Sequence, residues 1–162
     1  MRFIAILYIL LFSFIGQSQI YKTTGGIRLD DEQFGMSVTQ RVLPSTSVEL
    51  YADLASNNFQ TGINARQHVK LAGRRLNWYP QAGAHIGTFK NYGSFGGVDI
   101  GIGAEYKFIL FPAVISFDMM PSIHLAGNHP DWWNFNTVFS IKYIFVKDKK
   151  VKLPKRKESD ED

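Results

Sequence analysis

The sequence predicts an all-β protein, an eight-stranded antiparallel up-and-down transmembrane β-barrel. Apolar and polar residues alternate along most of the chain, as they do in a strand with two different faces. Charged residues of both signs collect on the polar face, and aromatic residues collect at strand ends on the apolar face. The mean hydropathy of −0.10 excludes a helical membrane protein but not a barrel, which gives half of its residues to a polar interior.

The length and the cysteine count limit what the chain can be. Its 162 residues suit one domain, and 13 Phe, 7 Tyr and 3 Trp argue against disorder. It contains no Cys, which excludes a disulfide framework, a thiolate metal site, a cysteine nucleophile and an acylated N-terminal cysteine.

The first residues have the pattern of a secretory signal peptide. Arg2 precedes an apolar run over residues 3–15, and Gly16 and Ser18 are the small residues expected before a cleavage site. The run is shorter than the roughly 20 apolar residues of a spanning helix, which argues against a membrane anchor. We therefore expect residues 1–18 to be removed and the net charge of the mature chain to fall from +4 to +3 with the loss of Arg2.

The mature chain contains eight segments that alternate. The clearest is 113–125, where every odd position is apolar and most even positions are polar. Most segments approach the 9–11 residues that a tilted transmembrane strand requires. The predicted strands are residues 21–29, 34–42, 46–54, 58–71, 77–89, 97–108, 113–125 and 136–145.

The connections between these strands form two sets. Residues 43–45, 72–75 and 109–112 lie at the end that carries both termini, and we expect them to be short periplasmic turns. The other set is 30–33, 55–57, 90–94 and the longer 126–134, which we expect to be more variable external loops.

The polar face contains six bases and five acids. An eight-stranded barrel is just wide enough for side chains to fill it, and buried charges are tolerated when they are paired. We expect a charge network in the lumen, with Gly62, Gly83, Gly87, Gly101 and Gly103 leaving room for it. The predicted network consists of Arg28, Arg41, Glu49, Asp53, Arg66, Lys70, Asp99, Glu105, Lys107, Asp118 and Lys142. The alternative is a secreted soluble barrel that turns its apolar face inward and binds an apolar ligand there.

Aromatic residues and prolines mark particular places on the apolar face. Two sets of rings at opposite strand ends resemble interfacial girdles: Phe34, Phe59 and Phe135 in one, and Trp78, Tyr106, Phe108, Tyr143 and Phe145 in the other. Pro80 and Pro121 each remove a hydrogen-bond donor from the strand ladder, so we expect bulges or strand ends there.

Several motifs resemble the small outer-membrane β-barrel proteins of gram-negative bacteria, of the OmpA/OmpX-like type. They are Asn77-Trp78-Tyr79, the glycine-rich segment 83–87, and above all the run 97–108 with its Gly-Ala-Glu-Tyr-Lys-Phe end. The resemblance implies an eight-stranded barrel in the outer membrane, usually without a known activity. Tyr143-Ile144-Phe145 is similar to the C-terminal signal read by the barrel-assembly machinery, except that 17 residues follow it.

The chain divides into a signal peptide (1–18), a barrel (19–145) and a charged tail (146–162). The tail carries seven bases and then an acidic end, and we expect it to be a disordered periplasmic extension. Export makes nucleic acid an unsuitable partner for its basic run. The expected partners are outer-membrane lipid and the assembly machinery, and the expected state is a monomer.

Two groups of residues on the polar face are candidates for chemistry. His68, His85 and His124 could approach a metal, but they lie on three strands without metal-ligand spacing, so interior hydrogen bonding is the favoured interpretation. Ser122 or Ser116 with His124 and Asp118 would suit a lipid-modifying enzyme, although the geometry cannot be derived from one strand. We predict no enzyme activity, no cofactor and no metal.

Trp132 and Trp133 are the strongest candidates for recognition of an external partner. Exposed Trp pairs are unusual away from an interface, although these two could instead belong to the outer girdle. The predicted function is a structural or surface-interaction role with a filled lumen and no open pore.

Overall fold

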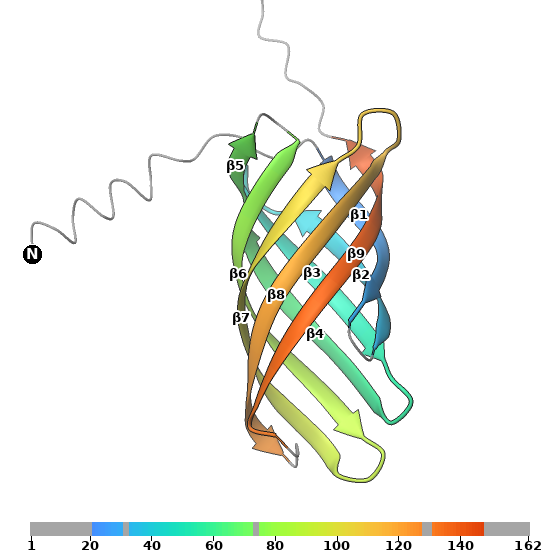
Figure 1. The fold of residues 1–162 in the computed structure, drawn as a ribbon, viewed down its shortest axis with the longest axis vertical. Coiled ribbons are helices and arrows are strands. Elements are labelled where there is room, and N and C mark those ends of the chain that lie inside the picture. Colours follow the sequence, from blue (N-terminus) through green and yellow to red (C-terminus); the bar gives the residue numbers. More distant parts are fainter. Residues whose placement is uncertain (1–20, 31–32, 73–74, 128–130, 148–162) are drawn as a thin grey trace, which may run out of the picture.

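A computed structural model describes residues 21–30, 33–72, 75–127 and 131–147 of the chain. The predicted signal peptide, and the predicted tail beyond Lys147, lie outside the described residues. The described chain forms tilted strands that wrap around one axis (Figure 1). The strands are β1 (Tyr21–Leu29), β2 (Phe34–Arg41), β3 (Thr46–Leu54), β4 (Asn58–Gln67), β5 (Val69–Ala72), β6 (Leu76–Phe89), β7 (Gly93–Lys107), β8 (Ala113–Gly127) and β9 (Trp133–Lys147).

The strands form a closed antiparallel barrel. Each strand pairs with the next except that β4 pairs with β6 and not with β5, and β1 pairs with β9 to close the sheet. Both β4 and β5 pair with β6 in one register, since Arg66 lies opposite Gln81 and Val69 lies opposite Trp78. These two segments are therefore one barrel strand with an interruption at His68. The predicted count of eight strands and the up-and-down order are confirmed.

The two ends of the barrel differ from the prediction in their connections. We call the end with the start of β1 and the finish of β9 the terminal end, and the opposite one the distal end. Strands β7, β8 and β9 each have 15 residues, so they extend further at the distal end than alternation indicates. The expected long connection at 126–134 shrinks to 128–132, because strand pairing continues to Gly127 and resumes at Trp133. Lys147 also belongs to β9, two residues beyond the predicted end of the barrel.

The two prolines interrupt the ladder without bending it. Pro80 pairs with Ile102 on one side, and on its other side the pairing of β6 stops at Arg66–Gln81 and resumes at Val69–Trp78. The ladder between β7 and β8 likewise passes from Asp99–Ser122 to Ile102–Met119 and omits Pro121. The expected bulges or strand ends are absent at both positions, because each proline lies inside a strand and the register is the same on either side of each gap. A missing N–H is tolerated here as a local gap in one ladder.

The barrel has a polar interior and an apolar exterior. Arg28 and Glu49 are only 2% and 0% exposed, whereas outward residues in mid-strand such as Ile102 and Met36 are 55% and 66% exposed. Both predicted sets of aromatic rings lie on this exposed face. Apolar residues that alternate inward, Val114, Val138 and Ile144, are buried in the lumen. Within the described ranges, no helix is long and apolar enough to span a membrane.

Candidate functional site

The lumen contains three clusters of polar side chains, each built around one buried carboxylate. Glu105 lies nearest the terminal end, Glu49 lies in the middle, and Asp99 lies towards the distal end, as their positions along β7 and β3 require. Strand alternation places all of these side chains inward. The predicted lumen charge network is therefore three clusters in series.

The central cluster gathers three bases around Glu49. Arg28 Nη1 lies 3.1 Å from Glu49 Oε2, and both Arg66 and Lys142 form ion pairs with the same carboxylate. The four side chains come from β1, β3, β4 and β9, and none is more than 3% exposed. Buried ion pairs offset the cost of desolvation only when their geometry is good and their remaining donors are satisfied.

Two further carboxylates complete the central cluster. Asp53 Oδ1 lies 3.2 Å from Arg28 Nε, and Asp118 Oδ2 lies 3.4 Å from Arg66 Nη2. Gln81 accepts a 3.0 Å hydrogen bond from Arg66 Nε and donates a 3.1 Å hydrogen bond to Asp118. Three acids thus face three bases, and the formal charge of this cluster is zero.

Tyrosine rings cover the two guanidinium groups of the central cluster. Arg28 Cζ lies 4.2 Å from the ring centroid of Tyr51, and Arg66 Cζ lies 5.0 Å from that of Tyr79. A Cβ atom on Gly62 would lie 2.6 Å from Tyr51 Cζ, and one on Gly103 would lie 2.7 Å from Tyr79 Cζ. These glycines therefore make room for rings, which in turn stack on the arginines.

A Cβ on Gly103 would also meet the Asp118 carboxylate of the network, whereas the other three predicted glycines border neutral groups. A Cβ on Gly87 would meet the Phe95 ring, one on Gly83 would meet the Asn64 amide, and one on Gly101 would meet the backbone of β8. The prediction that the glycines leave room for the charge network therefore holds at Gly103, while neutral side chains and backbone occupy the room beside Gly83, Gly87 and Gly101.

Gly103→Val should lower the free energy of unfolding of the refolded protein by about 1–3 kcal/mol, the usual cost of overpacking. The new side chain must displace the Asp118 carboxylate and push the Tyr79 ring away from Arg66. Chemical denaturation of the refolded protein measures the loss. Ala104→Val is the matched control, since Ala104 is the exposed neighbour on the same strand and should lose no more than about 0.5 kcal/mol. Equal losses in the two variants would contradict the ring-packing explanation.

The terminal cluster surrounds Glu105. Its carboxylate accepts a 2.6 Å hydrogen bond from the Tyr21 hydroxyl and a 2.9 Å hydrogen bond from the Asn77 amide. Lys107 Nζ lies 3.0 Å away, and His68 Nδ1 lies 3.2 Å away. The Lys107 ammonium also lies 5.1 Å from the centroid of the Tyr21 ring. One acid and one base thus balance in this cluster.

The distal cluster surrounds Asp99. Ser122 donates a 2.6 Å hydrogen bond to Oδ1, His85 Nδ1 lies 2.8 Å from the same oxygen, and the Tyr51 hydroxyl donates to Oδ2 at 3.2 Å. His85 Nε2 lies 3.0 Å from His124 Nδ1. Ser122 therefore bonds to the carboxylate and not to an imidazole, which differs from the nucleophile-to-base hydrogen bond of a catalytic triad.

The three candidate histidines do not gather at one point. His85 and His124 are in contact, whereas His68 lies in the terminal cluster and bonds through Nε2 to Ser47. Among the described residues, no group of three His, Cys, Asp or Glu side chains has the arrangement needed to hold a metal ion.

The structure brings together nine of the eleven side chains predicted for the charge network. Lys70 is exposed on β5, so the prediction is corrected for this residue, whereas Arg41 is half-buried at the last position of β2 and its membership stays a prediction. Both lie at the terminal end, where the lumen meets solvent. Alternation identifies the inward face, but it does not indicate how deep in the lumen a side chain lies.

Tyr21 also belongs to the network, although strand alternation does not place it on the inward face. The register between β1 and β9 shifts twice between Tyr21 and Thr24, and this irregularity turns Tyr21 into the lumen. Asn77 and Gln81 share the inward face with the predicted residues, and this face could have identified them.

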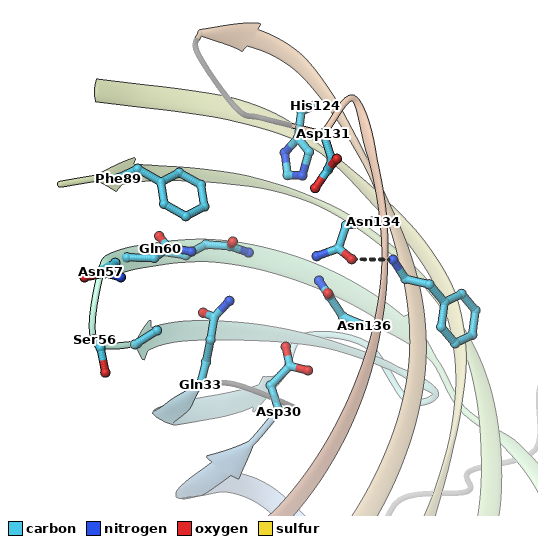
Figure 2. Close-up of a pocket in the computed structure, with 13 residues that line it drawn as sticks. Asp30, Gln33, Ser56, Asn57, Gln60, Phe89, His124, Asp131, Asn134 and Asn136 are labelled. Atoms are coloured by element: carbon cyan, nitrogen blue, oxygen red, sulfur yellow. Dashed lines mark hydrogen bonds between the residues drawn. The ribbon is translucent and has the colours of Figure 1, made fainter. Parts of the chain in front are cut away.

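A polar cavity lies at the distal end, above the Asp99 cluster. It has a volume of about 710 Å³, and we call it the distal cup. Figure 2 shows side chains from opposite walls of the barrel pointing into it. The cup is lined by Asp30, Gln33, Ala55, Ser56, Asn57, Asn58, Gln60, Phe89, His124, Asp131, Asn134, Phe135 and Asn136.

Trp132 and Trp133 lie on the rim beside this cup. Trp132 is 76% exposed, and its carbonyl accepts a 3.0 Å hydrogen bond from the backbone of His124. Trp133 begins β9 opposite Ile123 and is half-exposed. Their positions suit either of the two predicted roles, recognition or the outer girdle.

A solved structure shares this architecture. The N-terminal β-barrel domain of Pseudomonas aeruginosa OprF, known from a crystal structure, matches 76% of this chain and 96% of that domain with a TM-score of 0.62 and 13% sequence identity. The fold is that of an eight-stranded closed β-barrel. At this level of identity the likeness shows the fold alone. No family model matches the sequence, and no curated protein matches it.

Proposed function

We propose that the protein is a small outer-membrane barrel with a closed lumen, which acts structurally or through surface contacts and not as an open pore. The observation that carries this proposal is the inverted distribution of polarity. Charged side chains are buried inside, and a belt of Ile, Leu, Met and Phe covers the outside. A barrel is one of two structures that satisfy every backbone group within a bilayer.

The filled lumen supports the absence of a pore. Arg28, Glu49, Arg66 and Lys142 reach across the barrel from four strands and meet in its middle. An eight-stranded barrel has room for little else. The soluble alternative requires an apolar interior for its ligand, and the burial of these ions argues against it.

Membrane insertion is supported by the sequence pattern of the N-terminus and by the two aromatic sets on the exposed face. Rings such as Trp78 and Tyr143 at one end, and Phe34 at the other, suit the level of the lipid headgroups. With the terminal end of the barrel on the periplasmic side, the distal cup would face the cell exterior.

Gel mobility in SDS tests the proposal directly. Closed membrane barrels resist SDS until they are heated, so the mature chain extracted from membranes should change mobility after boiling. A sample unfolded in urea is the control and should migrate at the boiled position without heating. In planar bilayers the same protein should give no conductance of porin size. A chain that stays soluble without detergent and shows no shift would overturn the membrane location.

Ile102→Arg should destabilise the barrel in lipid vesicles by about 2–4 kcal/mol, because it places a charge on the lipid face near mid-strand. The matched control is Leu110→Arg in the turn between β7 and β8, where the side chain is 85% exposed and the cost should be at most about 1 kcal/mol. Urea titration followed by tryptophan fluorescence gives both values. If both variants lie within about 0.5 kcal/mol of the parent, Ile102 faces water.

We propose no catalytic role for Ser122. Ser122 is 1% exposed and donates its hydroxyl proton towards Asp99, which supports a structural use of this side chain. Ser122→Ala should leave the lipid composition of expressing cells unchanged. Loss of a lipid modification in that variant would instead support the lipid-modifying enzyme.

A further inference from the structure

The distal cup has the chemistry of a site for a hydroxyl-rich ligand. Six of its lining residues carry side-chain amides, from Gln33, Asn57, Asn58, Gln60, Asn134 and Asn136. An amide offers two donors and an acceptor, and a hydroxyl group both donates and accepts, so the two groups complement each other. The volume of about 710 Å³ lies within the range of small-molecule sites.

The charges around the cup exclude one class of ligand. Two carboxylates, Asp30 and Asp131, belong to the lining, and no Lys or Arg is among the described residues that form it. Phosphate or uronate groups would therefore meet repulsion without a compensating cation. A neutral ligand meets no such cost, and carboxylate oxygens are strong acceptors for its hydroxyl groups.

The cup also has a rigid floor and an apolar side. Gln60 donates to Tyr51, Asn136 donates to Ser122, and His124 contacts His85, so three lining side chains rest on the distal cluster. Phe89 lines the opposite wall and packs against Phe95 with ring centroids 5.2 Å apart. Sugars present C–H groups on one face and hydroxyls at the edge, which matches a ring beside a set of amides.

We propose that the distal cup binds a neutral glycan segment through its amides and carboxylates, with Phe89 against the apolar face of one sugar. This goes beyond the proposed function and does not depend on it, since the cup exists whether the barrel lies in lipid or in water. The glycan can be a free oligosaccharide or the headgroup of a neutral glycolipid.

NMR titration of the refolded mature chain tests the proposal, with side-chain amide signals as the readout. The protein is kept in a detergent without a sugar headgroup. The probes are maltotriose, N,N′-diacetylchitobiose, phosphorylated glucose and calcium chloride. We expect at least one neutral sugar to shift the signals of Gln60, Asn134 and Asn136, and phosphorylated glucose to bind at least about tenfold more weakly or not at all.

Three variants locate the binding. Asn136→Ala should weaken the neutral sugar about tenfold, the effect of losing one good hydrogen bond. Gln40→Ala is the matched control, because Gln40 is an exposed amide near the terminal end and should change nothing. Asp30→Asn with Asp131→Asn should weaken the neutral sugar, since each change removes a strong acceptor, and should reduce its advantage over phosphorylated glucose, since the repelling charges are gone. The heat-dependent SDS shift checks that each variant is folded.

The remaining outcomes are also decisive. Binding of calcium alone, abolished in the double Asn variant, would make the cup a cation site and overturn the proposal. Binding of the phosphorylated sugar as tight as that of a neutral one, or no shift with any sugar up to its solubility, would overturn it too. Nanodiscs with and without a neutral glycolipid separate the two sources of the glycan. Amide shifts in the glycolipid nanodiscs without added sugar would assign the ligand to the same membrane. Shifts only after free sugar is added would assign it to the medium.

Discussion

Replacing Glu49 by Gln should lower the free energy of unfolding by at least about 3–5 kcal/mol, the cost of breaking a buried ion pair by removing one partner. Arg28, Arg66 and Lys142 all pair with this one carboxylate, and it is completely buried. The amide keeps the shape but leaves three bases facing two acids. Urea unfolding in lipid vesicles measures the loss, which would also appear as a lower temperature for the SDS mobility shift.

A second substitution tests whether the loss of charge balance causes the loss of stability in Glu49→Gln. Glu49→Gln combined with Lys142→Met leaves two bases facing two acids, Asp53 and Asp118, and should recover at least half of the lost stability. Buried ion pairs can often be replaced by apolar groups of similar size at little cost, whereas single partners cannot be removed. If the double variant is less stable than Glu49→Gln alone, the side chain of Lys142 contributes through packing, and the charge explanation is wrong.

Glu105→Leu should destabilise the barrel by about 3 kcal/mol. The change leaves Lys107 as a buried base without its carboxylate, and it removes the acceptor of the Tyr21 and Asn77 hydrogen bonds. The same denaturation assay measures it. The expected loss is smaller than at Glu49, because this carboxylate pairs with one Lys and not with three bases.

The control for Glu105 is again a charge-balanced pair. Glu105→Leu with Lys107→Met should be more stable than Glu105→Leu alone, because no buried charge remains in the terminal cluster. A loss within about 0.5 kcal/mol for the single variant is the behaviour of a residue on a water-exposed sheet. That result would contradict both the burial of Glu105 and the filled lumen.

Alternation in the sequence predicts the strands well where each face has one character. The bounds of β1 and β3 agree with the prediction at both ends. The distal parts of β7 and β9 escape prediction because Gly93, Ser94 and Asn134 give no alternation of hydrophobicity. Backbone pairing with the neighbouring strands extends them there, and a pattern of side chains cannot detect this.

The sequence likewise predicts one part of the charge network and misses another. All five acids lie in the lumen as predicted, since the inward face follows from parity along each strand. Parity does not give depth, so Lys70 is assigned correctly to a face and wrongly to the buried network. A register shift also reverses parity, as at Tyr21. The distal cup combines side chains from loops and from several strands, and only their three-dimensional arrangement identifies it.

The position of Lys142 has a consequence for the order of assembly. The chain emerges from β1 to β9, and a sheet that lacks β9 already contains Arg28, Glu49, Asp53, Arg66 and Asp118. These side chains sum to one negative charge, so the incomplete sheet carries an unneutralised acid. The last strand supplies the missing positive charge at the moment it pairs with the first. The pairing of β9 with β1 therefore closes the barrel and neutralises the central cluster in one event, which disfavours half-closed intermediates during insertion.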